Sequence, residues 1–153
     1  MELRTCIIHV LRALEDFHAK NFCHRDVRWP NVVYDDVGGC WKLIDFEIAD
    51  KDGSPLPNDI SSEHVPPENL LKPRSMYTTK GDVYAVGKLV NEFMREKMNE
   101  IVPGNMADFI SESMHIKPSK RPSVTNLLKH PWLAVDESDD TLARGRGKRA
   151  RQN

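Results

Sequence analysis

The chain has few cysteines and no pattern that would pair them. Its 153 residues include only three, Cys6, Cys23 and Cys40, and no C-x-x-C motif is present. An odd number of scattered cysteines argues against a disulfide framework, so we expect free thiols in a reducing compartment.

Long apolar runs are also missing from the sequence. No stretch approaches the roughly 20 apolar residues that a membrane span requires. Residues 1–4 lack the apolar segment of a signal peptide. The net charge is −1, so the whole molecule has no field that would attract polyanions. We therefore expect a cytoplasmic or nuclear protein with no membrane partner.

The composition that remains is that of an ordinary soluble domain, with 39% hydrophobic and 29% charged residues. The length allows one domain with a hydrophobic core, which we assign to residues 1–134. From residue 135 onward the apolar content is low, and an acidic run precedes a basic one. We therefore expect a disordered tail over 135–153. Its segment Lys148–Arg151 fits a short nuclear-import pattern. No aromatic side chain that could stack on bases accompanies these basic residues, so we do not expect a nucleic-acid partner.

Hydrophobic periodicity predicts a mainly α-helical fold. Apolar residues recur at helical spacing over 4–20, 80–97, 105–115 and 123–129. Asp82 lies at the start of the second of these helices, and Ser123 is a candidate N-cap for the last.

One small β-hairpin is predicted between the first two helices. The β-prone runs 32–34 and 41–44 enclose a turn that contains Gly38 and Gly39. The segment 48–68 that follows is rich in turn residues, and we expect no regular structure there.

Polar residues gather on both sides of this hairpin. His24–Asp26 is followed by Asn31, and Asp45–Glu47 follows the second strand. The hairpin would place Asn31 at the start of one strand and Asp45 at the end of its partner, at little loop-closure cost. Mg²⁺ takes few protein oxygens and keeps water and phosphate oxygens. The pattern therefore indicates a Mg-phosphate site.

These motifs resemble the protein-kinase catalytic loop H-R-D-x-x-x-x-N and the Asp-Phe-Gly metal motif. The resemblance covers roughly residues 4–134. It implies the C-terminal lobe of a protein kinase that transfers phosphate from Mg-ATP to a Ser or Thr hydroxyl of a protein substrate. Asp26 would accept the proton of that hydroxyl, and Arg28 would face the transferred phosphate. Asn31 and Asp45 would hold Mg²⁺ and, through it, ATP.

The resemblance also implies supporting roles for other residues. His24 and Phe46 would hold the two loops on the second predicted helix, residues 80–97, by packing. Arg25 would meet a phosphorylated or acidic residue of the segment 48–68. The candidate phosphorylation sites in that segment are Ser54, Ser61 and Ser62.

Three later motifs fit the same family. Val65–Glu68 resembles the Ala-Pro-Glu motif, and the Arg121-Pro122-Ser123 stretch resembles the end of the kinase large lobe. In that family the arginine pairs with the glutamate, so we pair Arg121 with Glu68. Asp82 would accept backbone N–H bonds from the catalytic loop. The alternative for Asp82 is an acidic residue that only complements the helix dipole.

The sequence departs from the family in three places. Glu47 stands where the metal motif has Gly, and the span from Asp82 to Arg121 is short enough to omit the G helix. No G-x-G-x-x-G loop and no strand lysine is present. We therefore expect the large lobe alone, with the N-lobe absent. An upstream segment or a separate partner would supply that N-lobe.

Two other functions stay open. A chain with these departures could be a catalytically weak or dead pseudokinase that acts as a binding module. Ile44–Glu47 also resembles the I-D-[FW]-E motif of aminoglycoside and choline kinases, which phosphorylate small molecules. The segment Arg28–Asn31 with the altered metal motif is similar to fungal-type kinase-like proteins, including the kinase domains of Crinkler effectors.

Overall fold

The computed structural model describes residues 3–58, 60, 65–72, 75–96 and 103–134. The tail predicted over 135–153, with its segment Lys148–Arg151, lies outside the described residues, as do Ser61 and Ser62.

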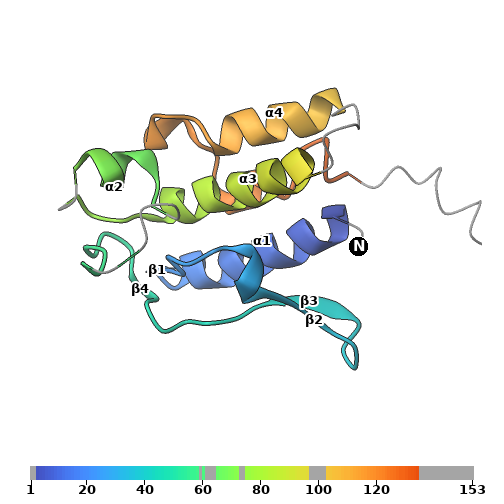
Figure 1. Ribbon diagram of the computed structural model, residues 1–153, viewed down its shortest axis with the longest axis horizontal. Coiled ribbons are helices and arrows are strands. Elements are labelled where there is room, and N and C mark those ends of the chain that lie inside the picture. Colours follow the sequence, from blue (N-terminus) through green and yellow to red (C-terminus); the bar gives the residue numbers. More distant parts are fainter. Residues whose placement is uncertain (1–2, 59, 61–64, 73–74, 97–102, 135–153) are drawn as a thin grey trace, which may run out of the picture.

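Helices dominate the described part of the chain. The helices are α1 (Leu3–Ala19), α2 (Pro67–Leu71), α3 (Thr79–Glu96), α4 (Gly104–Ser113) and α5 (Val124–Leu127). Helix α3 lies between α1 and α4, and α2 lies near the start of α3 (Figure 1). Short 3-10 turns cover Trp29–Asn31 (η1) and Pro118–Lys120 (η3).

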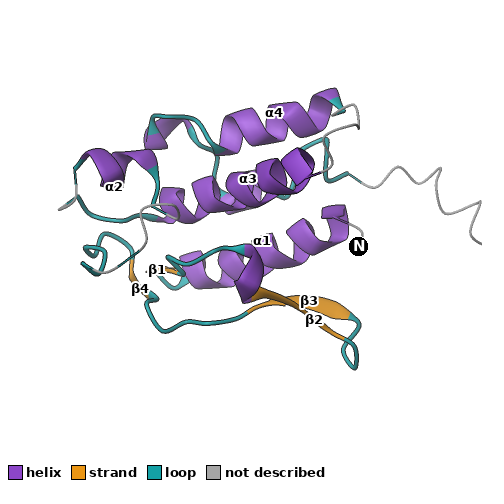
Figure 2. Ribbon diagram, viewed as in Figure 1, coloured by secondary structure: helices purple, strands orange, loops and turns teal. Residues whose placement is uncertain are grey.

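Two antiparallel strand pairs complete the fold (Figure 2). Strand β2 (Val32–Asp35) pairs with β3 (Cys40–Leu43), and this hairpin packs on the side of α1 away from α3. Strand β1 (Phe22–Cys23) pairs with β4 (Asp50–Lys51) beside the end of α1.

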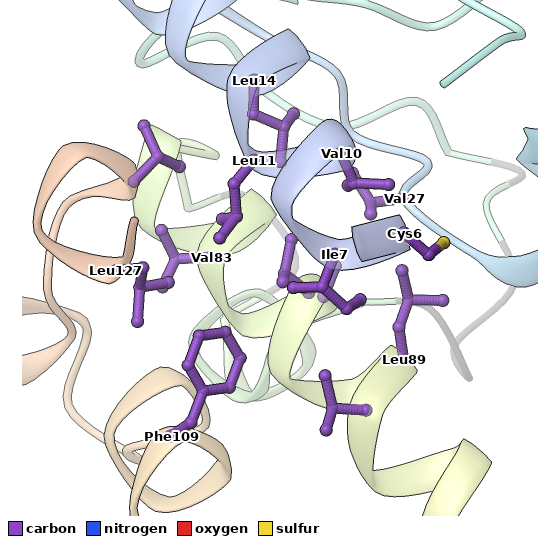
Figure 3. Packing of buried hydrophobic residues seen from close by; sticks show 14 of the residues in the cluster. Cys6, Ile7, Val10, Leu11, Leu14, Val27, Val83, Leu89, Phe109 and Leu127 are labelled. Carbon is purple, nitrogen blue, oxygen red and sulfur yellow. The ribbon is translucent and has the colours of Figure 1, made fainter. Parts of the chain in front are cut away.

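The core forms where α1 faces α3. The apolar side chains of Ile7, Leu11 and Leu14 are fully buried and join Val83 and Leu89 of α3 in one cluster (Figure 3). Phe109 of α4 and Leu127 of α5 extend the same cluster. Each such side chain contributes roughly 1.5–3 kcal/mol when it is fully buried. The amphipathic stripe of α1 is therefore what fixes the helix on the rest of the molecule.

Helix α1 ends at a residue with left-handed backbone. Asn21 has a φ of 58°, and its N–H bonds the carbonyl of His18 at 3.0 Å. Asparagine tolerates this conformation better than most residues, so the chain turns sharply and enters β1. This turn delivers the His24 loop to the same end of the molecule as the start of α3.

The four predicted helices and the predicted hairpin are confirmed, with boundaries that differ by a few residues. The prediction that 48–68 lacks regular structure is wrong at both ends. Asp50–Lys51 forms β4, and α2 begins at Pro67. The β1–β4 pair was missed because each strand has two residues, too few to show an alternating pattern.

No helix within the described ranges is both long and apolar enough to cross a membrane.

Candidate active site

Asp82 connects the candidate catalytic loop to the core. It lies in the first turn of α3 and is completely buried. Its carboxylate accepts bonds from the backbone N–H groups of His24 and Arg25, both at 2.9 Å. It also accepts bonds from His18 Nε2 at 2.9 Å and from the Tyr77 hydroxyl at 3.0 Å. The bonds expected from the loop are therefore present, and a role limited to the helix dipole does not account for them.

Tyr77 fills the space beside this carboxylate. The ring is buried, and a Cβ on Gly81 would clash with its Cζ atom. Burial, reinforced by the charge of Asp82, raises the pKa of Tyr77 well above its usual value. The hydroxyl therefore stays protonated at neutral pH and donates to Asp82.

His24 joins the two loops of the site through both ring nitrogens. Nε2 donates to the carbonyl of Ile44 at 3.1 Å, and Nδ1 accepts the N–H of Asp26 at 3.3 Å. This arrangement requires the neutral ring. Burial lowers the pKa of His24, although the charges of Asp82, Asp26 and Asp45 act in the opposite direction.

Phe46 packs against the His24 ring and against α1, whereas the sequence predicted packing on the helix over 80–97. Their centroids lie 5.0 Å apart in an edge-on arrangement, and Phe46 also stacks on Phe17 of α1 at 5.1 Å. Such aromatic pairs contribute about 0.5–1.5 kcal/mol each beyond their buried area. The metal-motif loop is therefore held against the end of α1 by an aromatic stack.

Asp26, Arg28 and Asn31 form one polar group at the end of the loop. Asn31 Nδ2 donates to the carboxylate of Asp26 at 2.7 Å and to its carbonyl at 2.8 Å. Arg28 Nε donates to the same carboxylate oxygen at 2.9 Å. Because the Asn31 amide nitrogen is committed to Asp26, its Oδ1 is the atom that remains to bind a cation.

The hairpin brings Asp45 next to this group. The register pairs Val32 with Leu43, and the N–H of Ile44 donates to the carbonyl of Asn31 at 2.9 Å. Asp45 follows directly, with a φ of 66°. Asn31 and Asp45, the two predicted oxygen donors, therefore lie on adjoining backbone segments, and their binding of a cation stays a prediction.

This donor set suits Mg²⁺ bound with a nucleotide. Magnesium uses one or two carboxylates and completes its shell with water and phosphate oxygens. No three His, Cys, Asp or Glu side chains among the described residues form a cage that would hold a metal by itself. The chemistry of the donors therefore fits a metal that arrives with phosphate ligands.

Arg25 is a buried cation with incomplete pairing. Its side chain is 3% exposed, and its φ is 73°. Nη1 lies 3.4 Å from the Ile48 carbonyl and 3.5 Å from Asp50 Oδ2. Nε and Nη2 are buried and have no hydrogen-bond partner in the protein. Asp50 is thus an acidic neighbour within the predicted segment 48–68.

The predicted pair between Glu68 and Arg121 is present and bidentate. Nη1 and Nη2 of Arg121 each donate to one Glu68 carboxylate oxygen at 2.7 Å. The remaining donors of Arg121 bond the carbonyls of His115 at 2.8 Å and Lys80 at 2.9 Å. The guanidinium also lies over the Tyr84 ring at 4.8 Å. This one side chain therefore joins α2, α3 and the segment before η3.

Sequence reasoning missed His18, Tyr77 and Asp50. His18 contacts Asp82 across 64 residues, and no local pattern reports a contact of that length. Asp50 meets Arg25 only because β4 pairs with β1. Tyr77 precedes Asp82 by five residues. Only its position as an aromatic residue close to a predicted helix start could have indicated the contact.

Comparison with known proteins agrees with this geometry. The model of the protein kinase domain family matches residues 1–99. Crinkler effector protein 8 of Phytophthora infestans is 30% identical over 151 residues, covering 97% of this chain and 25% of its own length. A calcium and calcium/calmodulin-dependent serine/threonine-protein kinase of Pisum sativum is 26% identical over 169 residues, covering 91% of this chain and 32% of its own length.

The chain thus spans about a quarter to a third of the length of these relatives. Among solved structures, the PK-1 kinase of the Cydia pomonella granulovirus has the same fold, with a TM-score of 0.73 and 23% identity. That match covers 87% of this chain and 58% of the viral kinase chain.

Proposed function

Because this chain belongs to the protein kinase domain family, we propose that it supplies the large lobe of an enzyme that transfers a phosphoryl group from Mg-ATP to a Ser or Thr hydroxyl of a protein. The observation that carries this proposal is the contact between Asp26 and Asn31 on a loop anchored by Asp82, with Asp45 beside them. Phosphoryl transfer requires positioned charge more than covalent chemistry. A rigid, buried anchor for the loop meets that requirement.

Each residue of the group has a distinct part in the proposed reaction. Asp26 accepts the proton of the substrate hydroxyl, and its carboxylate is oriented for this by bonds from Asn31 and Arg28. Asn31 and Asp45 would hold Mg²⁺ through their oxygens, and the ion would supply positive charge beside the phosphate groups. Arg28 is 36% exposed and can turn from Asp26 toward a transferred phosphate.

Thermal stability in the presence of Mg-ATP tests this proposal. A ligand present at 100 times its Kd raises the free energy of unfolding by about 2.7 kcal/mol. We expect the melting temperature to rise with Mg-ATP and the rise to disappear in Asp45→Asn. The Asp45→Asn variant without nucleotide is the control, and its melting temperature should match the wild type. No shift at millimolar Mg-ATP would refute nucleotide binding by this chain.

A pseudokinase that acts as a binding module is the second candidate. Glu47 adds a negative charge two residues after Asp45, where the metal motif of the family has Gly. This charge opposes catalysis without preventing a stable fold. A chain that binds Mg-ATP but transfers no labelled phosphate to dephosphorylated casein, with Asp26→Asn as the blank, would favour this candidate. Transfer to an aminoglycoside or choline instead of the protein would favour a small-molecule kinase.

We also propose that a small lobe, from an upstream segment or a separate partner, covers the site. Three apolar side chains of the hairpin and the loop after it are exposed: Val33 by 37%, Ile44 by 38% and Phe46 by 47%. Large apolar side chains at such positions commonly mark an interface.

Arg25 is the proposed receptor for an acidic or phosphorylated side chain of the segment 48–68. Two of its nitrogens are buried without a partner, and burying an unpaired charged donor is costly. Asp50 supplies one acidic group at 3.5 Å. Phosphorylated Ser54 would supply the oxygens that the remaining donors lack. If so, phosphorylation at Ser54 raises the melting temperature of the wild type but not of Arg25→Met.

A further inference from the structure

A cavity of about 380 Å³ opens where the end of α1 meets the starts of α3 and α5. None of the described residues with a part in the proposed reaction lines it. Its volume falls within the range of about 300–1,000 Å³ that small-molecule sites occupy. The buried side chains of Val83 and Val124 form its apolar part, and most of its other lining residues are polar. We call this cavity the α1–α5 pocket.

His18 gives the pocket a hydrogen-bond acceptor. Its side chain lines the pocket and is 10% exposed, and its Nε2 donates to Asp82 at 2.9 Å. Because a carboxylate cannot donate, the hydrogen of the neutral ring lies on Nε2, and Nδ1 is an acceptor. Nδ1 has no hydrogen-bond partner among the residues that the structure describes. A side chain that is nine-tenths buried therefore leaves one acceptor for an occupant of the pocket.

Two carboxylates line the same pocket, and each uses one oxygen to tie its walls together. Oε1 of Glu15 accepts the Thr125 hydroxyl at 2.6 Å, which joins α1 to α5. Oδ1 of Asp52 accepts the N–H of Thr79 at 2.9 Å, which joins the segment after β4 to α3. Neither carboxylate forms an ion pair within the described ranges of the chain. The walls are therefore set before a ligand arrives, which avoids the ordering cost of mobile sites.

Among the described residues, Lys80 is the one lysine or arginine that lines the pocket. Its Nζ donates to the carbonyl of Arg121 at 2.7 Å. Burial and the charge of Arg121 lower the pKa of Lys80. One ammonium group beside two carboxylates leaves the pocket with a net negative charge. An occupant with a positive charge and N–H donors matches both this charge and the acceptor on His18.

The surroundings of the pocket favour a small occupant over a protein. Protein interfaces are anchored by large apolar and aromatic side chains. In the part of the chain that the structure describes, no exposed large apolar side chain lines this pocket. Val83 and Val124 are 1% and 3% exposed, so they can contact a short alkyl chain but offer no apolar surface beyond it.

We propose that the α1–α5 pocket binds a small aliphatic cation, a guanidinium or primary ammonium group on a short alkyl chain. One N–H of the cation donates to His18 Nδ1, and the carboxylates of Glu15 and Asp52 balance its charge. This site goes beyond the proposed phosphoryl transfer, because it requires neither Mg-ATP nor Asp26. It also lies close to the candidate catalytic loop in the hydrogen-bond network, since the Asp82 oxygen that His18 bonds also accepts the N–H of His24.

The test uses NMR on the full chain without nucleotide, with n-butylguanidinium as the probe. At pH 8 an ordinary histidine is neutral, and we expect the probe to shift the ¹⁵N signals of the His18 ring in a saturable manner. The matched probe is n-butylurea, which keeps the shape and the N–H donors and loses the charge. It should bind about fivefold to tenfold more weakly, because charge-assisted hydrogen bonds are about twice as strong as neutral ones. Equal binding of the two probes would overturn the selection for a cation.

Two variants place the site. Glu15→Gln and Asp52→Asn each keep an acceptor oxygen for the contacts within the protein and remove one charge. Each should weaken the binding of n-butylguanidinium by about twofold to fivefold, the contribution of a partly exposed ion pair. Asp36→Asn is the matched control, since Asp36 is an exposed acidic residue of the hairpin turn, and it should leave the affinity unchanged. An equal loss in all three variants would show attraction to the overall charge and would overturn the site.

A capped arginine, N-acetyl-arginine N′-methylamide, distinguishes a free cation from a protein side chain. It should bind no more tightly than n-butylguanidinium, because the pocket has no apolar surround for a peptide backbone to cover. Binding about tenfold tighter would overturn the small-molecule assignment in favour of a protein partner. No shift of the His18 signals with either probe would refute the pocket as a site, whatever the outcome with Mg-ATP.

Discussion

At the scale of single residues, the candidate site contains an imidazole that the fold keeps neutral. His24 uses both ring nitrogens in bonds that require the neutral form, and burial lowers its pKa. Below about pH 6.5, an unfolded histidine takes up a proton. The folded protein does not until the pH falls further, so the unfolded state binds more protons in this range and is favoured.

We therefore expect the free energy of unfolding to fall as the pH is lowered below about 6.5. His24→Asn should show a shallower dependence, because asparagine does not titrate. Urea denaturation at several pH values between neutrality and pH 5 measures both slopes. Identical slopes in the two proteins would contradict the assignment of a lowered pKa to His24.

The three thiols provide a second prediction at this scale. Burial raises the pKa of Cys6 to about 11, and burial with the nearby charges of Asp82 and Asp52 also raises the pKa of Cys23. Thiol reagents attack the thiolate, and Cys40 is partly accessible on the hairpin. We expect one fast-reacting thiol at pH 8 and three in denaturant, measured with a chromogenic disulfide reagent. Cys40→Ser should abolish the fast phase, and its persistence would contradict the burial of the other two.

At the scale of elements, Gly87 sets the approach of α3 to α4. A Cβ at this position would lie 2.6 Å from Cβ of Ser113 and 2.8 Å from Cγ of Met114. Ser113 cannot withdraw without moving α4, because it is buried and its hydroxyl donates to the carbonyl of Phe109 at 2.7 Å. The close contact of these helices therefore depends on the missing side chain.

Gly87→Ala should accordingly destabilise the protein by about 1–3 kcal/mol, the usual cost of overpacking. Gly104→Ala is the matched control, because nothing lies within 4 Å of a Cβ there. It should be neutral or stabilise by up to about 1 kcal/mol through the lower entropy of the unfolded chain. Chemical denaturation measures both changes. Equal effects of the two substitutions would contradict the packing argument.

The elements also show what the sequence could and could not predict. Helices α1 and α3 were predictable because each carries an apolar stripe over four or more turns, and the hairpin was predictable from its turn residues. The hairpin prediction put Asn31 and Asp45 on adjoining strand ends, and the helix prediction put Asp82 at the start of α3, as the structure has them. The β1–β4 pair and the Arg25–Asp50 contact were not predictable. Two-residue strands have no measurable period, and their partners are chosen by the path of the whole chain.

The contacts of the candidate site also divide into those that the sequence predicted and those that it could not predict. The pair between Glu68 and Arg121 was predicted only because a family pattern supplied it, since 53 residues separate the two. His18 and Tyr77 lay inside or next to predicted elements, yet neither spacing nor composition assigned them to Asp82. Contacts that form a buried network across the chain are set by tertiary packing, which a local pattern does not contain.

At the scale of the whole molecule, Arg121 holds distant parts of the chain together. Its side chain is fully buried, whereas that of Glu68 is 22% exposed. Removing one partner of a buried ion pair costs about 3–5 kcal/mol. Arg121→Ala should fall in this range, and Glu68→Ala should cost less because water reaches the glutamate.

A double-mutant cycle with Glu68→Ala and Arg121→Ala measures the coupling. Because the bonds are bidentate and share buried surroundings, the coupling energy should exceed about 1 kcal/mol. Urea denaturation of the four proteins provides the values. Strictly additive effects would show that the contact does not join α2 to the rest of the molecule.

The left-handed backbone at Asp45 has a consequence for interpreting sequence variation. Only glycine, asparagine and aspartate occupy such a conformation with little strain. A lineage that lost its ability to handle phosphate could exchange the carboxylate for an amide at this position without loosening the turn. Melting without nucleotide would then reveal nothing, and an inactive descendant would be as stable as its active ancestor.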